Sequence, residues 1–232
     1  MTAGPSPVEH GGGALAVAGD GTRYELVPDR HHLTITTPGG SARRVGRLGT
    51  EAGELNYPIA VVAVGGLAYV VEMGNHRVQA FDREGRSLAI LGAGELLYPG
   101  GITARGSRLF VADTAHGHVV ELATGGGVIG RFGHDTLMAP RGLAPLGDHL
   151  LVADVGRRRV VELRDDGSIV RAFGGDWVMP HGVATDGDSV YVADRSRPEL
   201  AVFDRGGQRI DTLPLGAAAR YVTVAGDELF AG

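Results

Sequence analysis

The sequence predicts an all-β propeller, and three observations lead to this fold class. Prolines recur 41, 41 and 40 residues apart, at Pro58, Pro99, Pro140 and Pro180. Each proline is followed by four short runs rich in Val, Leu, Ile, Phe and Tyr, separated by Gly- and Asp-containing turns. No stretch has sustained helical periodicity. A repeat of about 40 residues with four strands is typical of a propeller blade, which packs on its neighbours around a common axis.

The composition agrees with a chain that turns often and has an ordinary core. Gly accounts for 39 of the 232 residues, and 43% of the residues are hydrophobic. There is no Cys, which excludes disulfides, thiolate nucleophiles and Cys-ligated metals. The net charge of −5 gives no basic bias toward nucleic acid, and no apolar run approaches the length of a membrane span.

The repeat divides the chain into five complete units and a half unit. These cover residues 14–49, 58–92, 99–133, 140–174, 180–216 and 220–232. We expect one propeller domain over 14–232, with six blades and a last blade that is incomplete or closed from the N-terminus. Residues 1–13 are then either a flexible lead-in or the closing strand. The alternative is a five-bladed ring, in which 220–232 pairs with strands from 30–48 and 14–27 lies outside.

An acid ends the second run of each unit. The acids are Asp29, Glu72, Asp113, Asp154 and Asp194. A carboxylate at the end of a strand can accept backbone N–H bonds from the turn. We therefore expect these acids to be structural turn residues, and neither a calcium ring nor a pair of catalytic acids.

Two units carry motifs that resemble the NHL repeat. One contains Asn75-His76-Arg77-Val78-Gln79 followed by Phe81-Asp82 and Gly85, and the other contains Pro180-x-Gly182-Val183-Ala184 and Val192-Ala193-Asp194. The first unit departs from the family pattern, since it has Pro58-Ile59-Ala60 at its start and Glu72 in place of Asp. The resemblance covers about residues 14–232. It implies a propeller fold and says little about function.

The residue after each repeat proline is the most informative position for function, because it falls where the innermost strand enters the central channel. The residues there are Ile59, Gly100, Arg141, His181 and, by a weaker alignment, Arg220. Arg141, His181 and Arg220 would form a cationic arc suited to a carboxylate or phosphate. The alternative is that these side chains pair with nearby acids or fill the channel.

No residue set indicates catalysis, a metal or a cofactor. The channel position of His181 resembles a zinc ligand of the NHL-like peptidyl-hydroxyglycine lyase, but Ile59, Gly100 and Arg141 do not match. One His is not a catalytic zinc site. Nothing in the sequence places the other candidate histidines near one another; these are His116, His118, His134 and His149. The cluster Arg157–Arg159 is diluted by Asp165 and Asp166, which disfavours nucleic acid.

The sequence therefore favours a non-catalytic scaffold that binds a protein or peptide. The alternative is an enzyme with a central-channel site, similar to a peptidyl-hydroxyglycine lyase or a lactonase. We expect neither nucleic-acid binding nor membrane insertion, and the oligomeric state stays open. Without a signal-peptide pattern at the start, the expected location is cytoplasmic, unless the chain is a fragment of a longer protein. Trp177, with Tyr57 and Tyr98, is expected to wedge between blades.

Overall fold

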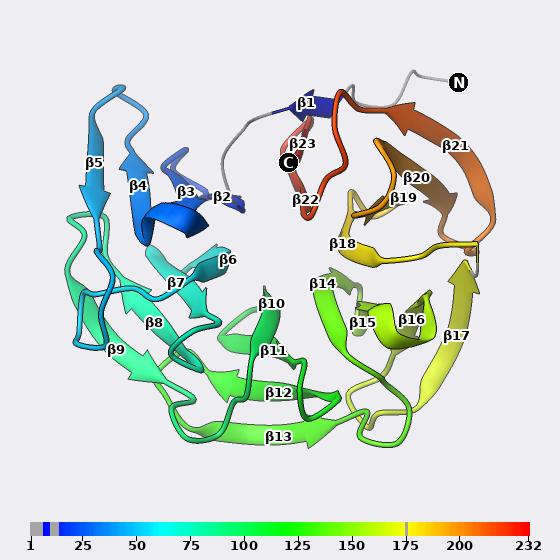
Figure 1. Ribbon diagram of the computed structural model, residues 1–232, viewed down its shortest axis with the longest axis horizontal. Coiled ribbons are helices and arrows are strands. Elements are labelled where there is room, and N and C mark those ends of the chain that lie inside the picture. Colours follow the sequence, from blue (N-terminus) through cyan, green and yellow to red (C-terminus); the bar gives the residue numbers. More distant parts are fainter. Residues whose placement is uncertain (1–6, 10–13, 175) are drawn as a thin grey trace.

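The structure, a computed structural model, describes residues 7–9, 14–174 and 176–232. Figure 1 shows these residues as small sheets arranged around a central axis. Five sheets are four-stranded and antiparallel, and a sixth is three-stranded. The prediction of an all-β propeller is confirmed. Across the described ranges, the helical segments are too short to traverse a lipid bilayer.

Each of the five complete blades is a meander that runs from an innermost to an outermost strand. The strands are β2 (Leu15–Val17), β3 (Arg23–Val27), β4 (His32–Thr36) and β5 (Ala42–Val45) in blade 1; β6 (Pro58–Val64), β7 (Leu67–Glu72), β8 (Arg77–Phe81) and β9 (Ser87–Leu91) in blade 2; β10 (Pro99–Arg105), β11 (Arg108–Asp113), β12 (His118–Ala123) and β13 (Val128–Phe132) in blade 3; β14 (Pro140–Leu146), β15 (His149–Asp154), β16 (Arg159–Leu163) and β17 (Ile169–Gly174) in blade 4; and β18 (Pro180–Thr185), β19 (Ser189–Asp194), β20 (Glu199–Asp204) and β21 (Arg209–Pro214) in blade 5. Two short 3-10 helices follow β3 and β15, namely η1 (Pro28–Arg30) and η2 (Val155–Arg157).

The sixth sheet combines both ends of the described chain. It contains β22 (Val222–Ala225), β23 (Glu228–Ala231) and β1 (Pro7–Glu9), and β1 pairs in parallel with β23. β22 contacts β18 on one side and β2 on the other, so this sheet lies between blades 5 and 1. Residues 14–27 lie in blade 1, whereas the five-bladed alternative placed them outside the ring. The other residues of the segment 1–13, namely 1–6 and 10–13, lie outside the described residues.

Adjacent blades share hydrophobic clusters, and one position in each connection fills the space between them. Three residues before the repeat prolines stand Leu55, Leu96, Leu137 and Trp177, which are at most 5% exposed. The prediction for Trp177 is confirmed, since it packs among side chains of blades 4 and 5. Tyr98 does not wedge, because it directly precedes Pro99 with a φ of 48° and is 52% exposed. Tyr57 has the same backbone conformation.

The inner strands approach one another closely around the axis. A Cβ on Gly142 would lie 2.6 Å from the carbonyl oxygen of His181, and one on Gly101 would lie 2.5 Å from that of Arg141. Such distances are too short for any side chain. The glycine of the repeat motif therefore lets neighbouring backbones pack against each other.

The repeated acids hold the connections between blades. Glu72, Asp113, Asp154 and Asp194 are at most 3% exposed. Each accepts an N–H bond from a residue 16 positions earlier, just before the repeat proline; these donors are Asn56, Leu97, Met138 and Val178. The backbone donor that all four acids share thus precedes the acid, whereas the expected backbone donors followed it. Among the four, Asp194 also accepts the N–H of a following residue, Ser196.

The assignment of Asp29 to this set is wrong. In blade 1, Val27 pairs with His32 at the register position where Glu72 pairs with Arg77. Asp29 lies two residues later, exposed in η1. No described residue donates a hydrogen bond to its carboxylate, and Asp29 instead lines the central cavity.

Candidate functional site: the mouth of the central channel

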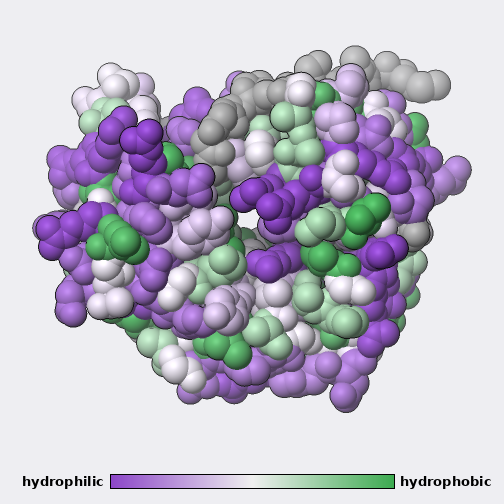
Figure 2. Space-filling model, in the orientation of Figure 1, coloured by the Kyte–Doolittle hydropathy of each residue, from purple (hydrophilic) through white to green (hydrophobic). Residues whose placement is uncertain are grey.

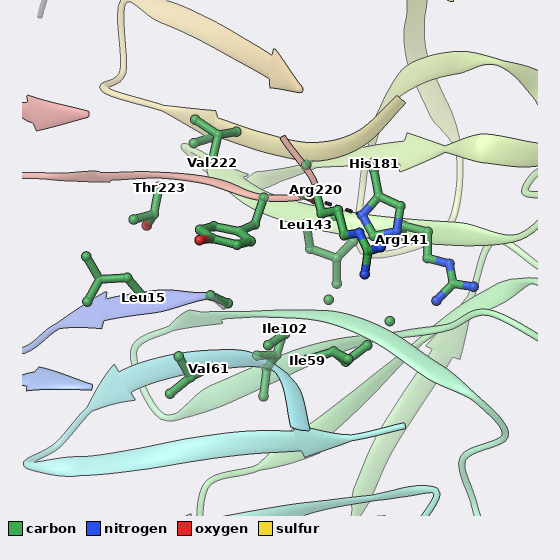
Figure 3. A pocket seen from close by; sticks show the side chains of 18 of the residues that line it. Leu15, Ile59, Val61, Ile102, Arg141, Leu143, His181, Arg220, Val222 and Thr223 are labelled. Carbon is green, nitrogen blue, oxygen red and sulfur yellow. Dashed lines mark hydrogen bonds between the residues drawn. The ribbon is translucent and has the colours of Figure 1, made fainter. Parts of the chain in front are cut away.

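A central cavity of about 720 Å³ runs between the inner strands of all six sheets. Apolar side chains such as Leu15, Val61, Ile102, Leu143 and Val222 line part of its wall (Figure 3), and polar groups line the rest. Figure 2 shows that the cavity opens at the centre of the molecule and that hydrophilic residues gather at the opening. A cavity of this size fits a small molecule or the end of a peptide.

In blades 2 to 5, a β-bulge places the residue after the repeat proline at this mouth. The pairing of the first two strands shifts register directly after Pro58, Pro140 and Pro180. A bulge leaves the extra residue unpaired and re-aims its side chain. Here the extra residues include Arg141 and His181, and both line the cavity.

Arg220 takes the same place in the sixth sheet. It lies two residues before Val222, as His181 lies two residues before Val183, and it also lines the cavity. Figure 3 shows Arg141, His181 and Arg220 side by side at one end of the pocket. The structure therefore places Arg141, His181 and Arg220 next to one another at the mouth. Ile59 and Gly100, on blades 2 and 3, make the other side of the mouth apolar and open.

Arg141 is half-buried and reaches across the mouth. Its Nη1 lies 3.6 Å from Sδ of Met73, which follows Glu72 on blade 2. A Cβ on Gly100 would lie 3.3 Å from Cδ of Arg141, so the missing side chain at Gly100 leaves room for the guanidinium stem. Burial, and then the charge of Arg195, lower the pKa of Arg141. A bound anion would favour the charged form of Arg141 and so oppose the effect of burial on its pKa.

His181 is neutral, and its hydrogen bond determines which nitrogen carries the proton. Nδ1 lies 2.7 Å from the carbonyl oxygen of Arg220. A carbonyl only accepts, so Nδ1 is the protonated nitrogen and Nε2 is left as an acceptor. Burial above all, and the charges of Arg141, Arg195 and Arg220, lower the pKa of His181 to about 4. The predicted cationic arc included His181, but the neutral ring presents an acceptor, Nε2, to the cavity instead of a positive charge.

Arg195 supplies the third cation of the mouth in place of His181. It follows Asp194 as Met73 follows Glu72, and it lines the cavity. Among the described residues, Arg141, Arg195 and Arg220 form no ion pair. Asp29 is the one acidic side chain among the described lining residues. The alternative interpretation had these side chains pair with nearby acids, and no such ion pair is present among the described residues.

The remaining predicted candidates have structural partners or lie elsewhere. Arg159 of the Arg157–Arg159 cluster pairs with Asp154 at 3.1 Å and donates to the carbonyl of Thr136. His149 lies 2.6 Å from Glu162. The rings of His116, His118 and His134 contact one another in blade 3, although nothing in the sequence placed these histidines close together. Of the described residues that line the cavity, His181 is the one histidine, so these residues do not form a zinc site.

The chain matches no protein-family model and no curated protein. Solved propellers are similar in structure. Virginiamycin B lyase from Staphylococcus aureus has a TM-score of 0.74 at 11% identity, over 95% of this chain and 77% of that one. A chain of a nidogen/laminin complex has a TM-score of 0.79 at 18% identity, over 93% of this chain and 85% of that one. A catalytically inactive histidine-to-alanine variant of the same lyase, solved with quinupristin, has a TM-score of 0.72 at 10% identity, over 100% and 79%. At such identities the likeness shows the fold alone, and it includes both an enzyme and a binding protein.

The lowered pKa of His181 makes stability depend on pH. The unfolded chain binds a proton at His181 near its ordinary pKa of about 6.5, whereas the folded chain binds one only near pH 4. Stability is therefore lost as pH falls from about 6.5 toward 4. We expect the free energy of unfolding to fall by about 1–2 kcal/mol more in the wild type than in His181→Asn between about pH 7 and pH 5. The Asn amide can still donate to the Arg220 carbonyl. Urea denaturation at each pH measures the difference, and parallel pH profiles would contradict the prediction.

Proposed function

We propose that the chain is an NHL-type propeller that binds a protein or peptide without catalysis and docks an acidic group of that partner at the channel mouth. The single observation that carries the proposal is the set of cations Arg141, Arg195 and Arg220, without ion-pair partners among the described residues, at one end of the central cavity. Guanidinium groups favour a carboxylate, which they bind through two parallel hydrogen bonds, and the group of Arg141 is also partly buried. The resemblance to the NHL repeat supports the same assignment.

The chemistry of the mouth indicates what the partner presents. Its anionic group meets the guanidinium groups, and an N–H or O–H next to that group donates to Nε2 of His181. A peptide carboxylate has such a neighbour, because a backbone N–H lies within a few bonds of it. The apolar wall formed by Ile59, Ile102 and Leu143 then accepts an adjoining side chain. The proposed ligand is thus an acidic residue or a C-terminal carboxylate of a peptide.

An enzyme with a site in this channel is the second candidate function. It is favoured by one observation, the unprotonated Nε2 of His181 in a cavity. A virginiamycin B lyase of similar fold is inactive after a histidine-to-alanine change. However, a base with a pKa of about 4 removes protons poorly at neutral pH, since a general base works best with a pKa near the operating pH. The three arginines therefore suit binding better than proton abstraction.

The binding proposal is tested with fluorescein-labelled peptides in pairs that differ only in a free or an amidated C-terminus, alongside peptides with internal Asp or Glu. We expect the acidic peptides to bind the wild type. The double variant Arg141→Gln/Arg220→Gln should bind them at least about 100-fold more weakly, since each hydrogen bond to a charged group contributes about 1.5–3 kcal/mol. Arg44→Gln is the matched control, because Arg44 is exposed on the outermost strand of blade 1. Affinity that stays within twofold (about 0.4 kcal/mol) in the double variant would contradict the proposal. Turnover of lactones or quinupristin by the wild type, lost in His181→Ala, would favour the enzyme instead.

A further inference from the structure

Blade 3 departs from its neighbours at the buried acid that ends the second strand. In blade 2, Arg77 donates to Glu72 at 2.5 Å, and in blade 4, Arg159 donates to Asp154 at 3.1 Å. The same register position in blade 3 pairs Asp113 with His118. His118 therefore stands where two other blades place a guanidinium group against the acid.

His118 does not replace that guanidinium group. Its Nε2 lies 3.7 Å from Oδ2 of Asp113, which is too far for a hydrogen bond. Asp113, with no exposed side-chain surface, is left with hydrogen bonds from Leu97 N and from His116 Nδ1. Blade 5 also lacks the arginine, but there four groups donate to Asp194; they are the N–H groups of Val178, Met179 and Ser196 and the hydroxyl of Ser196.

An orphaned nitrogen points to a missing partner. His118 is 4% exposed, and its Nε2 is buried without a hydrogen-bond partner. A buried polar atom without a partner costs about 1–3 kcal/mol. The atom lies on the side of Asp113 that a guanidinium group occupies in blades 2 and 4. A cation between His118 and Asp113 would satisfy both groups.

The residues around this gap are ones that bind metals. His116 lies at the position of Asn75 in blade 2, and its Nδ1 is 2.8 Å from Oδ2 of Asp113. Ligand atoms of Asp113, His116 and His118 all lie within 4.8 Å of one another. Four ligands at about 2.0–2.2 Å from zinc are roughly 3.3 Å apart, so small side-chain movements suffice to close this set around an ion.

A fourth residue also distinguishes this blade. His134 follows β13, and its ring centroid lies 4.1 Å from that of His118. The corresponding position in blade 2 is Ala93. The ring of His134, an exposed residue, therefore packs on the ring of the buried His118.

We propose that Asp113, His116 and His118 form a binding site for a divalent transition metal ion, with zinc as the foremost candidate. Two imidazole nitrogens and one carboxylate oxygen are ligands that zinc prefers, and three protein ligands leave a position for water. The ion supplies the positive charge that Arg77 and Arg159 supply in blades 2 and 4. It joins the β11–β12 turn to the buried carboxylate that holds the preceding connection. This site is distinct from the channel mouth and does not depend on the function proposed there. It also departs from the sequence prediction of no metal.

The test uses a chain without a polyhistidine tag, stripped with a chelator and then titrated with Zn²⁺ in a calorimeter. We expect one equivalent to bind, and Co²⁺ in its place to give visible d–d absorption bands. His118→Arg is expected to weaken Zn²⁺ binding by at least about 100-fold while the protein stays folded, because the new side chain can pair with Asp113 as Arg159 pairs with Asp154. Zn²⁺ should raise the melting temperature of the wild type and leave that of His118→Arg unchanged.

Two further variants keep the outcome decisive. His116→Ala removes a side chain that is 48% exposed, so it is expected to fold, and it should also lose Zn²⁺ binding. His32→Ala removes a histidine of blade 1 away from the cluster and should bind as the wild type does. The proposal is overturned if the stripped wild type takes up no stoichiometric Zn²⁺, or if His118→Arg and His116→Ala bind it as tightly as the wild type.

Discussion

Replacing Trp177 with alanine is expected to lower the free energy of unfolding by about 3–5 kcal/mol, the usual cost of removing a large buried aromatic side chain. Trp177 is 2% exposed and packs edge-to-face on Phe203, with ring centroids 5.4 Å apart. Its ring also lies directly on the backbone of Gly174, where a Cβ would be 2.1 Å from Cζ3. The cavity left by alanine would therefore lie between two blades, where rigid sheets cannot close around it.

The measurement is urea denaturation followed by circular dichroism, since Trp177 is the one tryptophan of the chain and its loss removes the fluorescence signal. Val178→Ala is the matched control, because the neighbouring Val178 is 49% exposed and should change stability by less than about 0.5 kcal/mol. Trp177→Leu tests whether a smaller apolar side chain can fill part of the space between the blades. Leucine fills the equivalent position in the earlier connections, so this variant should recover part of the loss. A loss of under about 1 kcal/mol in Trp177→Ala, at most a third of the expected cost, would contradict the packing of Trp177 between the blades.

Much of this fold could be predicted because the repeat is local and its phase is marked by residues with few structural options. The prolines start inner strands, and the acids end second strands in blades 2 to 5. The error at Asp29 has a physical reason. Val27-Pro28-Asp29 imitates the Val-Ala-Asp strand end, but Pro28 has no backbone N–H to continue the ladder, and the chain turns into η1 at that point. The register of the pairing with β4, which no short motif encodes, places Val27 at the position of the acid.

The site could be predicted in position but only partly in chemistry. Repeat phase places Arg141 and His181 at the mouth because the bulge after the proline recurs from blade to blade. The acceptor role of His181 depends on the backbone of Arg220, 39 residues away, and no spacing within a unit reveals it. Arg195 was within reach of the same reasoning, since the residue after each acid also recurs in phase. The clustering of the blade 3 histidines could not be predicted, because it depends on which strand ends meet.

The buried acid of blade 2 provides the second large effect. Glu72→Gln is expected to lower the free energy of unfolding by about 3–5 kcal/mol, as for other buried ion pairs that lose one partner. Four donors converge on the carboxylate: Asn56 N, Asn75 Nδ2, Arg77 Nε and Gln79 Nε2, at 2.5–3.0 Å. An amide offers one oxygen and one NH₂ group, so its nitrogen would face two of these donors, and the guanidinium of Arg77, 6% exposed, would lose its counter-charge.

A double-mutant cycle separates the lost charge from the lost hydrogen bonds. Arg77→Met removes the guanidinium group and also frees the carbonyls of Thr50, Glu51 and Glu54, to which it donates. If the Glu72–Arg77 pair accounts for most of the cost, Glu72→Gln should cost clearly less in the Arg77→Met background than in the wild type. Glu84→Gln, at a half-exposed carboxylate of the same blade, is the control and should have little effect. Equal costs of Glu72→Gln in both backgrounds would assign its effect to Asn56, Asn75 and Gln79. The buried Glu72 would then not need the charge of Arg77, and the absence of an arginine beside Asp113 in blade 3 would not by itself indicate a missing cation.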